Sequence, residues 1–532
     1  MSERYRVLVA DSIALDGLAP LRDDPRFELV VKPNLKDPEL ADAIAEADAV
    51  LVRSATRITR DSLARADRLK VIGRAGVGVD TIDVDAATER GIAVLTAPAG
   101  NTISAAELTF ALLLALARKV PEAHRSMREG QWDRKSFTGI ELYGKTLGLI
   151  GAGRIGGEVA RRARAFGMRV LAYDPFLNAE RARALDVEVA TLDQAIERAD
   201  IISVHVPLTD STRNLIGRPE IARMKRGVFL LNVARGGVVD EAALLEALHS
   251  GQVGGAALDV YSQEPLPADH PLRNAPNVVL TPHLGASTME AQHHVAVEIA
   301  EAVRAALLEG DLSRAVNAPD VGGADMQRLR PVLELARQVG TIAAAMAGAP
   351  LAEVEVRYAG SHPAGVRLVA AAAVAGALAH LSGAPVNIVN ALKFAASRNI
   401  RVAHAAREPA QGYPEFVEVR VVSDTAEGRV AGALRAPDYP RLVRVGDFAV
   451  DVPPQGTLLL VRHRATPQVA GALNTLLGSE GITLLEYQQV HRDSGRAEAL
   501  SLLRLGSPVS SAVLSRISGL PEASGVLQVE LT

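Results

Sequence analysis

Residues 146–167, TLGLIGAGRIGGEVARRARAFG, decide the fold class of the central part of this chain. Gly151, Gly153 and Gly156 form a GxGxxG pattern directly after an apolar strand and at the start of a helix. The first glycine allows a tight turn, the second lets the backbone approach a pyrophosphate, and the third lets helix and strand pack closely. The free N–H groups and the dipole of the helix N-terminus favour phosphate there. The segment therefore predicts a dinucleotide-binding unit.

An acidic residue ends the next apolar segment. RVLAYD reads as a strand and ends at Asp174, 23 residues after Gly151. A carboxylate about 20 residues beyond the glycine turn hydrogen-bonds the adenosine ribose in dinucleotide-binding folds. Its charge repels a 2′-phosphate, so we predict NAD rather than NADP as the cofactor. The alternative is a tight turn between strand and helix with an unrelated aspartate.

Short apolar strands alternate with helical segments on both sides of this stretch, up to about residue 310. Such alternation is typical of parallel sheets covered by helices. We predict an α/β fold with two doubly wound, Rossmann-like domains. The first domain takes strands at 5–11, 49–54, 69–76 and 92–98. It is expected to be discontinuous, at 1–98 and 288–316, and the second, with six strands and a helix at 104–119, to span 99–287.

The remaining chain predicts two further domains. Residues 315–326 contain proline and paired glycine and read as a linker, and DVPPQG at 451–456 reads as a second break. Residues 317–453 mix helices with strands, so we expect an α+β domain there. Residues 454–532 follow the order βαββαβ, which is the ferredoxin-like arrangement.

Composition excludes several classes of protein. The chain has 532 residues, a net charge of −4 and no cysteine. Several domains are therefore expected, no nucleic-acid or membrane surface is indicated, and disulfides and thiolate metal sites are excluded. The longest apolar run, residues 110–117, is far shorter than a membrane span. The N-terminus carries no secretory pattern. We expect a cytoplasmic protein and predict no metal site.

Three polar residues follow three successive predicted strands. Arg235 follows LLNVA, Glu264 follows ALDV, and His283 follows VVLTP. Ligands bind at the carboxyl ends of strands in open α/β sheets, so these side chains are expected in one crevice with the nicotinamide. Taken singly, each has a structural reading, as a surface charge, a loop residue and a strand cap.

The chemistry of the three side chains suggests distinct catalytic roles. Oxidation of a secondary alcohol needs a base, and His283 titrates in the right range. Glu264 would orient the imidazole and stabilise its charged form. Arg235 would grip a substrate carboxylate with paired hydrogen bonds and polarise the neighbouring carbonyl. The set predicts oxidation of a 2-hydroxy acid to a 2-keto acid.

Motifs spread over nearly the whole chain resemble one family. GRAGVGVDTIDVDAA, GNTISAAE, LGLIGAGRIG, NVARGGVVDEAAL, AALDVYSQEP and TPHLGAST are similar to the D-isomer-specific 2-hydroxyacid dehydrogenases. VNIVNALKFAASRNIRV resembles the intervening domain of the long form of the family, and the C-terminus looks like an ACT regulatory domain. The family's catalytic residues map onto Arg235, Glu264 and His283.

The resemblance implies further contacts. A small phosphorylated 2-hydroxy acid is the implied substrate, and a homo-oligomer, dimer or tetramer, is the implied assembly. The implied cofactor-binding residues, beyond Gly151, Gly153, Gly156 and Asp174, are Arg154, Ile155, Val206, Val233, Ala234, Asp259, Gly285 and Ala286. The implied substrate-binding residues are Arg53, Ser54, Arg74, Ala75, Gly76 and Asn101, with Arg134 and Lys135 supplied to the neighbouring subunit. A solvated charge pair is the alternative for the last two.

The ACT-like segment departs from the family pattern. Relatives hold serine there with an aspartate, a Pro-Gly pair and an Asn-Ile pair. This chain has Ala465, Pro467-Gln468 and Thr483-Leu484 at these places. We therefore predict weak or absent inhibition by L-serine. Thr81 and Val206 also differ from many relatives, away from the reacting groups.

Two rival functions fit parts of the sequence. A glyoxylate or hydroxypyruvate reductase would share the catalytic residues, but such relatives usually lack two C-terminal domains. An NAD-sensing binding protein would bind the cofactor with little turnover, but the catalytic residues are all present.

Overall fold

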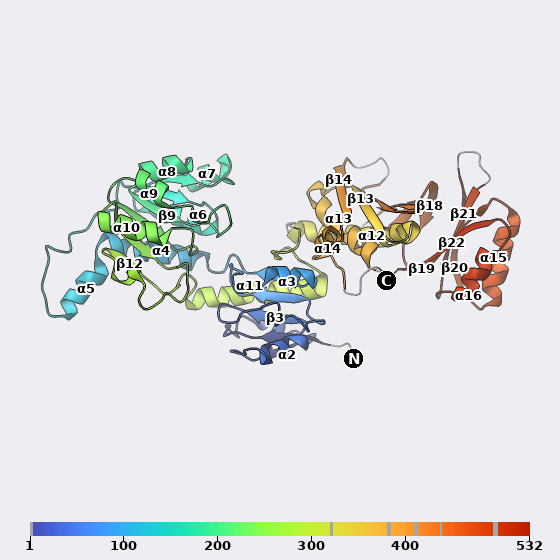
Figure 1. Ribbon diagram of the computed structural model, residues 1–532, viewed down its shortest axis with the longest axis horizontal. Coiled ribbons are helices and arrows are strands. Elements are labelled where there is room, and N and C mark those ends of the chain that lie inside the picture. Colours follow the sequence, from blue (N-terminus) through green and yellow to red (C-terminus); the bar gives the residue numbers. More distant parts are fainter. Residues whose placement is uncertain are drawn as a thin grey trace. The chain divides into compact units, whose positions relative to one another are not determined.

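The structure is a computed structural model that describes residues 4–319, 323–379, 385–408, 413–436, 439–492 and 498–531 (Figure 1). The chain forms two compact units. The first unit comprises Met1–Ile13, Ala19–Thr96 and Ile299–Thr532, and the second comprises Ala14–Leu18 and Ala97–Glu298. Helix α11 (Met289–Glu309) contributes residues to both units. The sequence-based domain boundaries stay predictions.

The first unit begins with a five-stranded parallel sheet of order β2-β1-β3-β4-β5. Its strands are β1 (Tyr5–Val9), β2 (Phe27–Val31), β3 (Ala49–Val52), β4 (Val71–Arg74) and β5 (Ala93–Thr96), and its helices are α1 (Ala19–Arg22), α2 (Glu39–Ala45) and α3 (Val84–Glu89). The prediction of four strands missed β2. This strand lies at the sheet edge and is half exposed, so its apolar signal is weak.

The second unit contains a seven-stranded parallel sheet of order β12-β11-β10-β9-β6-β7-β8. Its strands are β6 (Thr146–Ile150), β7 (Arg169–Tyr173), β8 (Glu188–Val189), β9 (Ile201–Val204), β10 (Val228–Asn232), β11 (Val253–Leu258) and β12 (Val278–Leu280). The six predicted strands are confirmed, and β8 is an added, exposed two-residue strand. The strand order reverses between β6 and β9, which places a ligand crevice at their carboxyl ends.

The helices of the second unit are α4 (Thr102–Ala117), α5 (Val120–Arg128), α6 (Arg154–Ala165), α7 (Ala179–Leu185), α8 (Leu192–Arg198), α9 (Arg218–Arg223), α10 (Glu241–Ser250) and the short η1 (Pro271–Asn274). Helices cover both faces of the sheet, whereas α5 lies away from it (Figure 1). The helix predicted at 104–119 corresponds to α4. It ends earlier because Lys119 has a left-handed backbone, with φ at 50°, and the chain then starts α5.

The α+β domain contains a six-stranded sheet of order β14-β13-β15-β16-β17-β18. Its strands are β13 (Leu351–Ala359), β14 (Arg401–Arg407), β15 (Glu415–Ser423), β16 (Glu427–Leu434), β17 (Pro440–Val445) and β18 (Phe448–Val452), and its helices are α12 (Gly323–Ala347), η2 (Pro363–Gly365), α13 (Val366–Leu378) and α14 (Ala391–Ser397). The linker prediction at 315–326 is wrong at its end, because α12 begins at Gly323; residues 320–322 lie outside the described part.

The last domain contains the four-stranded antiparallel sheet β20-β21-β19-β22. Its elements, in chain order, are β19 (Gly456–Arg464), α15 (Pro467–Ser479), β20 (Leu484–His491), β21 (Glu498–Leu505), α16 (Ser511–Ser518) and β22 (Ala523–Leu531). This is the predicted βαββαβ order. Both helices pack on one face of the sheet through Leu459, Leu473 and Ile517. Leu458 and Leu460, on the other face, belong to the core of the six-stranded sheet.

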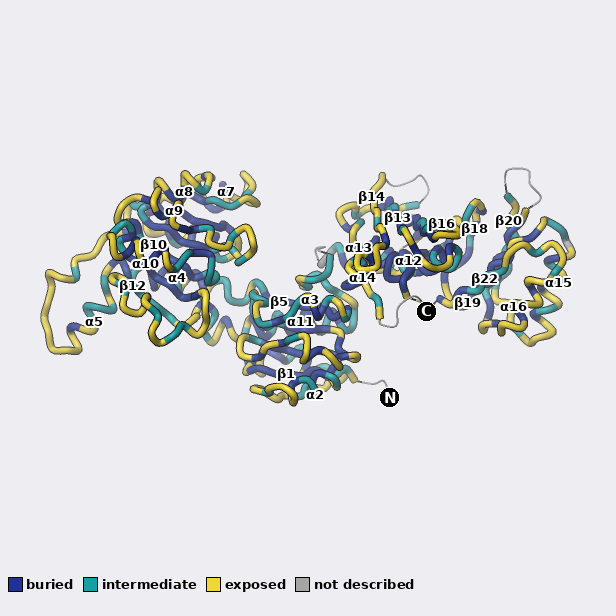
Figure 2. The backbone as a smooth tube through the Cα atoms, viewed as in Figure 1, coloured by how far each residue is buried: buried dark blue, intermediate teal, exposed yellow. Residues whose placement is uncertain are grey.

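The buried core follows the sheets (Figure 2). Strands β3, β6 and β9 are buried along their whole length, as expected for parallel strands covered on both faces. Within the described ranges, no helix combines the length and the apolar character that a membrane crossing requires.

Candidate active site and dinucleotide site

The three predicted catalytic residues leave neighbouring strands at the same edge of the seven-stranded sheet. Strands β10, β11 and β12 pair in parallel, and Arg235, Glu264 and His283 follow their respective carboxyl ends. The shared direction of parallel strands therefore brings three loops together that are separated in the sequence.

His283 and Glu264 form a hydrogen-bonded pair. Nδ1 of His283 lies 2.7 Å from Oε2 of Glu264, and the other oxygen of Glu264 accepts the backbone N–H of Tyr261 at 3.0 Å. An ionised carboxylate only accepts, so Nδ1 carries the proton and Nε2 keeps its lone pair. The side chain of His283 is 49% exposed, which leaves the ring accessible.

Their contact shifts the pKa values of His283 and Glu264 in opposite directions. The hydrogen bond that His283 donates to Glu264 raises the pKa of His283, against an opposing effect of partial burial. Burial by itself would raise the pKa of Glu264, but the hydrogen bonds from His283 and Tyr261 outweigh it and lower the pKa. The charge of Arg235 lowers both pKa values.

The Arg235 loop is shaped by two neighbours that the sequence reading did not single out. The side chain of Asn232, only 2% exposed, donates to the carbonyl of Arg235 at 2.9 Å and accepts the N–H of Ala234 at 3.1 Å. A Cβ on Gly236 would lie 1.8 Å from the carbonyl oxygen of Tyr261. Glycine therefore allows the Arg235 loop to lie directly against the loop that carries Glu264.

Asp259 anchors the turn that carries His283. Its carboxylate accepts Thr281 Oγ1 at 2.6 Å and the backbone N–H groups of Leu284 at 2.7 Å and Gly285 at 2.9 Å. Burial raises the pKa of Asp259, although these hydrogen bonds oppose that shift. His283 has a left-handed backbone, with φ at 56°, which such an anchored turn can maintain.

The glycine turn has the geometry of a dinucleotide cradle. A Cβ on Gly156 would lie 2.1 Å from the carbonyl oxygen of Gly151, so helix α6 packs against the turn only without a side chain there. Gly151 has φ at 98°, which favours glycine. A Cβ on Gly153 would meet no atom of the described residues within 4 Å, so the backbone is open where a pyrophosphate would approach.

Asp174 lies beside this turn. Its Oδ2 accepts the N–H of Ala152 at 2.8 Å, and its Oδ1 accepts the N–H of Phe176 at 2.8 Å. His205, which sequence reasoning missed, follows β9 and lies against Gly151 and Gly156. Burial lowers the pKa of His205 to about 4, so it is neutral at physiological pH. The sequence signal that could have identified His205 is a histidine directly after a buried strand.

The other predicted cofactor residues lie in the second unit. Arg154 and Ile155 start α6, and Val206 follows β9 with its Cγ1 3.0 Å from the position of a Cβ on Gly151. Val233 and Ala234 follow β10, and Gly285 and Ala286 follow the His283 turn. Their contacts to a cofactor remain predictions.

The predicted substrate residues divide between the two units. Arg53 and Ser54 follow β3, and Arg74 ends β4 and is followed by Ala75 and Gly76, all in the first unit. Buried Asp11, missed in the sequence, shapes the first of these loops: it accepts the N–H of Arg53 at 2.5 Å and Thr56 Oγ1 at 2.6 Å.

The remaining predicted substrate residues lie in the second unit. Asn101 precedes α4, and its Oδ1 is buried without a hydrogen-bond partner in the described structure. Arg134 and Lys135 lie on an exposed loop after α5. In the described part of the chain, no group of three or more His, Asp or Glu side chains is arranged to hold a metal ion.

Comparison with known proteins places this chain in a family. Residues 110–285 match the D-isomer-specific 2-hydroxyacid dehydrogenase NAD-binding domain, and residues 328–446 match the D-3-phosphoglycerate dehydrogenase intervening domain. The chain is 41% identical to the D-3-phosphoglycerate dehydrogenase of Synechocystis, over 96% of this chain and 92% of that protein. The chain belongs to the D-3-phosphoglycerate dehydrogenase family.

The similarity to this family extends over the full length. The D-3-phosphoglycerate dehydrogenase of Bacillus subtilis is 39% identical over 99% of this chain and 100% of its own length. A solved glyoxylate reductase from Paecilomyes thermophila is 32% identical with a TM-score of 0.54, and it covers 59% of this chain and 99% of its own. The D-3-phosphoglycerate dehydrogenases therefore match the C-terminal domains as well. The chain binds NAD through the NAD-binding domain matched at residues 110–285.

Proposed function

We propose that this protein oxidises D-3-phosphoglycerate to 3-phosphohydroxypyruvate with NAD, the step that opens the phosphorylated pathway of L-serine biosynthesis. The observation that carries the proposal is the His283–Glu264 hydrogen bond of 2.7 Å, at the strand ends that also carry Arg235. Relatives named D-3-phosphoglycerate dehydrogenase, which match nearly the whole chain, support the choice of substrate.

The proposed mechanism assigns one task to each side chain. When bound, the nicotinamide supplies the acceptor for the hydride from C2. Nε2 of His283 accepts the proton of the C2 hydroxyl, because Nδ1 is already committed to Glu264. The Glu264 carboxylate stabilises the imidazolium that results. Arg235 binds the substrate carboxylate and polarises the carbonyl that forms.

The substrate phosphate requires further positive groups. We propose Arg53 and Arg74, with Ser54, Ala75, Gly76 and Asn101 completing the site. The buried Oδ1 of Asn101, which has no hydrogen-bond partner among the described residues, supports a role as a hydrogen-bond acceptor. The cofactor residues named from the sequence are proposed as contacts to NAD, with Asp174 on the adenosine ribose.

We further propose a homo-oligomer, dimer or tetramer, in the cytosol. The segment around α5 exposes large apolar side chains, among them Met127 at 54%, Trp132 at 78% and Tyr143 at 79%. Such side chains are typical of a covered interface. In that assembly Arg134 and Lys135 would reach the substrate phosphate of the neighbouring subunit. Light scattering tests the assembly, and a monomer that is fully active would contradict it.

A substrate panel tests the proposed activity. NADH consumption is measured with phosphohydroxypyruvate, hydroxypyruvate and glyoxylate, and the phosphorylated compound is expected to have the highest kcat/KM. Preference for glyoxylate or hydroxypyruvate would instead identify a reductase of small 2-keto acids. NADH binding without turnover of any of the three would identify a sensor.

A further inference from the structure

The first unit contains a cavity of about 670 Å³ at the end of the five-stranded sheet opposite to Arg53 and Arg74. Its floor is formed by residues that precede three strands: Asp48 directly before β3, Lys70 directly before β4, and Arg90 with Gly91 shortly before β5. The end of α11 and residues 385–389 of the intervening domain form the opposite wall. We propose that this cavity binds a small organic anion, with a carboxylate or phosphate on Lys70 and Arg90 and an apolar body against the opposite wall.

The charges on the floor favour an anion. Arg68, Lys70 and Arg90 carry three positive charges, and Asp48 and Asp67 carry two negative charges, which leaves one positive charge. Asp48 is 4% exposed and already accepts the N–H of Arg6 at 2.8 Å and Nη2 of Arg68 at 3.0 Å. Most of the hydrogen-bonding capacity of the Asp48 carboxylate is therefore used by partners within the domain of the five-stranded sheet.

Two cationic side chains keep donors for a ligand. Nζ of Lys70 lies 4.0 Å from Asp48 Oδ1 and donates no hydrogen bond within the described ranges; it lies 5.0 Å above the ring of Tyr5. Arg90 pairs through Nη2 with Asp67, a 90% exposed side chain, at 2.5 Å. The Nε of Arg90 is buried and lacks a partner in the described structure. An oxyanion would satisfy these groups better than the exposed pair does.

The opposite wall is apolar and fits the body of such a ligand. Leu307 near the end of α11, Leu312 just after this helix, and Ile388 and Val389 line the cavity. A volume of about 670 Å³ lies within the usual range of roughly 300–1,000 Å³ for small-molecule sites. Apolar walls with a few charged groups are the usual composition of such sites.

Side-chain contacts hold the cavity wall formed by the intervening domain against the domain that contains the five-stranded sheet. Asn387 Nδ2 donates to the carbonyl of Gly91 at 2.8 Å, and Lys393 Nζ pairs with Asp85 at 2.7 Å. Gly91 has φ at 72°, and a Cβ there would lie 2.7 Å from Asn387 Nδ2. A ligand in the cavity therefore contacts both domains and stabilises their junction.

Strand β4 connects this cavity to the proposed substrate loops. Lys70 precedes β4 and Arg74 ends it, so the two lie roughly 13 Å apart along one strand at about 3.3 Å per residue. A ligand that displaces Lys70 would also act on Arg74 through this hydrogen-bonded strand. Occupancy of the cavity is therefore expected to change the KM for the phosphorylated substrate. This effect on KM rests on the proposed function, whereas anion binding in the cavity does not.

Hexyl phosphate and hexanoate are suitable probes, measured on the full chain by calorimetry and by thermal unfolding. Hexylammonium has the same body with the opposite charge. Both anions are expected to bind and raise Tm, since a ligand that binds only the native state stabilises it. Hexylammonium is expected to have no effect. Equal binding of hexylammonium, or no binding of either anion, would overturn the proposal whatever the enzyme assay shows.

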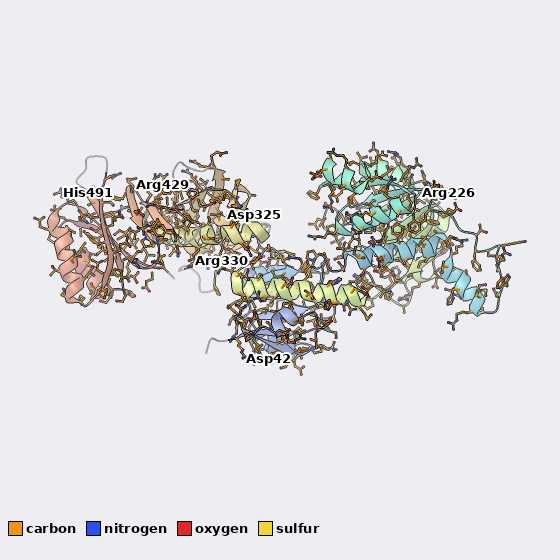
Figure 3. The ribbon with its side chains drawn as sticks, turned by 180° about the vertical axis from the view of Figure 1, so that it is seen from behind. Asp42, Arg226, Asp325, Arg330, Arg429 and His491 are labelled. Carbon is orange, nitrogen blue, oxygen red and sulfur yellow. The ribbon has the colours of Figure 1, made fainter. Side chains whose placement is uncertain are left out.

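Substitutions of the cavity residues test whether the probe binds there. Lys70→Gln and Arg90→Gln are each expected to weaken hexyl phosphate about tenfold or more, from the 1.5–3 kcal/mol of a hydrogen bond to a charged group. Lys32→Gln, directly after β2, and Arg65→Gln are the matched controls, because neither residue lines the cavity. Arg65 pairs with Asp42, which Figure 3 labels, just as Arg90 pairs with Asp67.

Two more variants separate this cavity from the active site. Leu307→Trp fills the apolar side and is expected to abolish binding while it keeps every charge. Arg235→Gln removes the catalytic guanidinium and is expected to leave binding unchanged. Loss of binding in Arg235→Gln, with full binding in Lys70→Gln and Leu307→Trp, would assign the anion to the active site and refute the proposal.

Discussion

Nδ1 of His283 lies 2.7 Å from Oε2 of Glu264, although the two residues are 19 positions apart in the chain. The contact exists because each residue follows one of two adjacent parallel strands, β12 and β11, at the same sheet edge. The Asp259 carboxylate holds the histidine turn, and Tyr261 joins the two loops by donating its hydroxyl to the carbonyl of Thr281 at 2.9 Å. The first predictions concern this pair.

Replacing His283 with alanine is expected to lower kcat by roughly 10² to 10⁴, the usual contribution of a general base. NADH affinity, measured by fluorescence titration, should stay near the wild-type value, because the glycine turn is untouched. His249→Ala changes an exposed histidine on α10 and serves as the control. A His283→Ala enzyme with wild-type kcat would remove the general base from the mechanism.

The pH profile should follow the raised pKa of His283. Oxidation needs the neutral imidazole, so kcat/KM for oxidation is expected to rise with pH through a pKa above the ordinary histidine value of 6.5. Reduction needs the imidazolium and should decline over the same interval. Glu264→Gln removes the charge that stabilises the imidazolium, so the oxidation limb should move to lower pH. If the pH dependence of oxidation in Glu264→Gln stayed in place or moved to higher pH, the role of the Glu264 charge beside His283 would be contradicted.

Gly236→Ala tests the contact between the Arg235 and Glu264 loops. A Cβ there would lie 1.8 Å from the carbonyl oxygen of Tyr261, so the loops must separate. We expect a loss of stability of about 1–3 kcal/mol, typical of overpacking, and a fall in kcat/KM on the order of 10²-fold. Gly471→Ala, in α15 where a Cβ meets no described atom within 4 Å, is the control and should keep kcat/KM and raise stability by up to about 1 kcal/mol, from helix propensity. Equal behaviour of the two variants would show that the loops tolerate separation.

Asp174→Ser is expected to shift the ratio of kcat/KM for NADP over NAD upward by at least about tenfold. The carboxylate lies beside the glycine turn and its like charge repels a 2′-phosphate, a penalty of several kcal/mol at a close contact. Steady-state assays with both cofactors measure the ratio. Asp186→Ser, on the exposed side chain after α7, provides the comparison. An unchanged ratio in Asp174→Ser would place the adenosine ribose elsewhere.

L-Serine is expected to inhibit weakly or not at all. Ala465 follows β19 and Thr483 precedes β20, so neither position offers the carboxylate or the amide with which relatives hold serine. Activity assays over a range of L-serine concentrations test this. Strong inhibition that Thr483→Ala abolishes would show that the site binds serine by other groups.

Sequence patterns predicted the elements whose signal is local. The buried strands of both parallel sheets and the βαββαβ order were readable from apolar runs and turn residues. Strand β2 was missed because edge strands are only half buried, and β8 because two exposed residues carry no pattern. The supporting residues Asp11, Asn232 and His205 were missed for a different reason. Each acts through hydrogen bonds or packing contacts that only the folded loops create.

The sequence by itself determined that this chain has a GxGxxG turn, an acidic residue one strand later, and an arginine, a glutamate and a histidine after three successive strands. Those features depend on spacing along the chain. Only the tertiary structure decided that the imidazole meets the carboxylate, that Asp259 anchors its turn, and that a charged cavity lies at the far end of strands β3 to β5. Parallel pairing aligns strand ends, whereas the few ångströms that make a hydrogen bond depend on register, loop packing and the absence of a Cβ at Gly236.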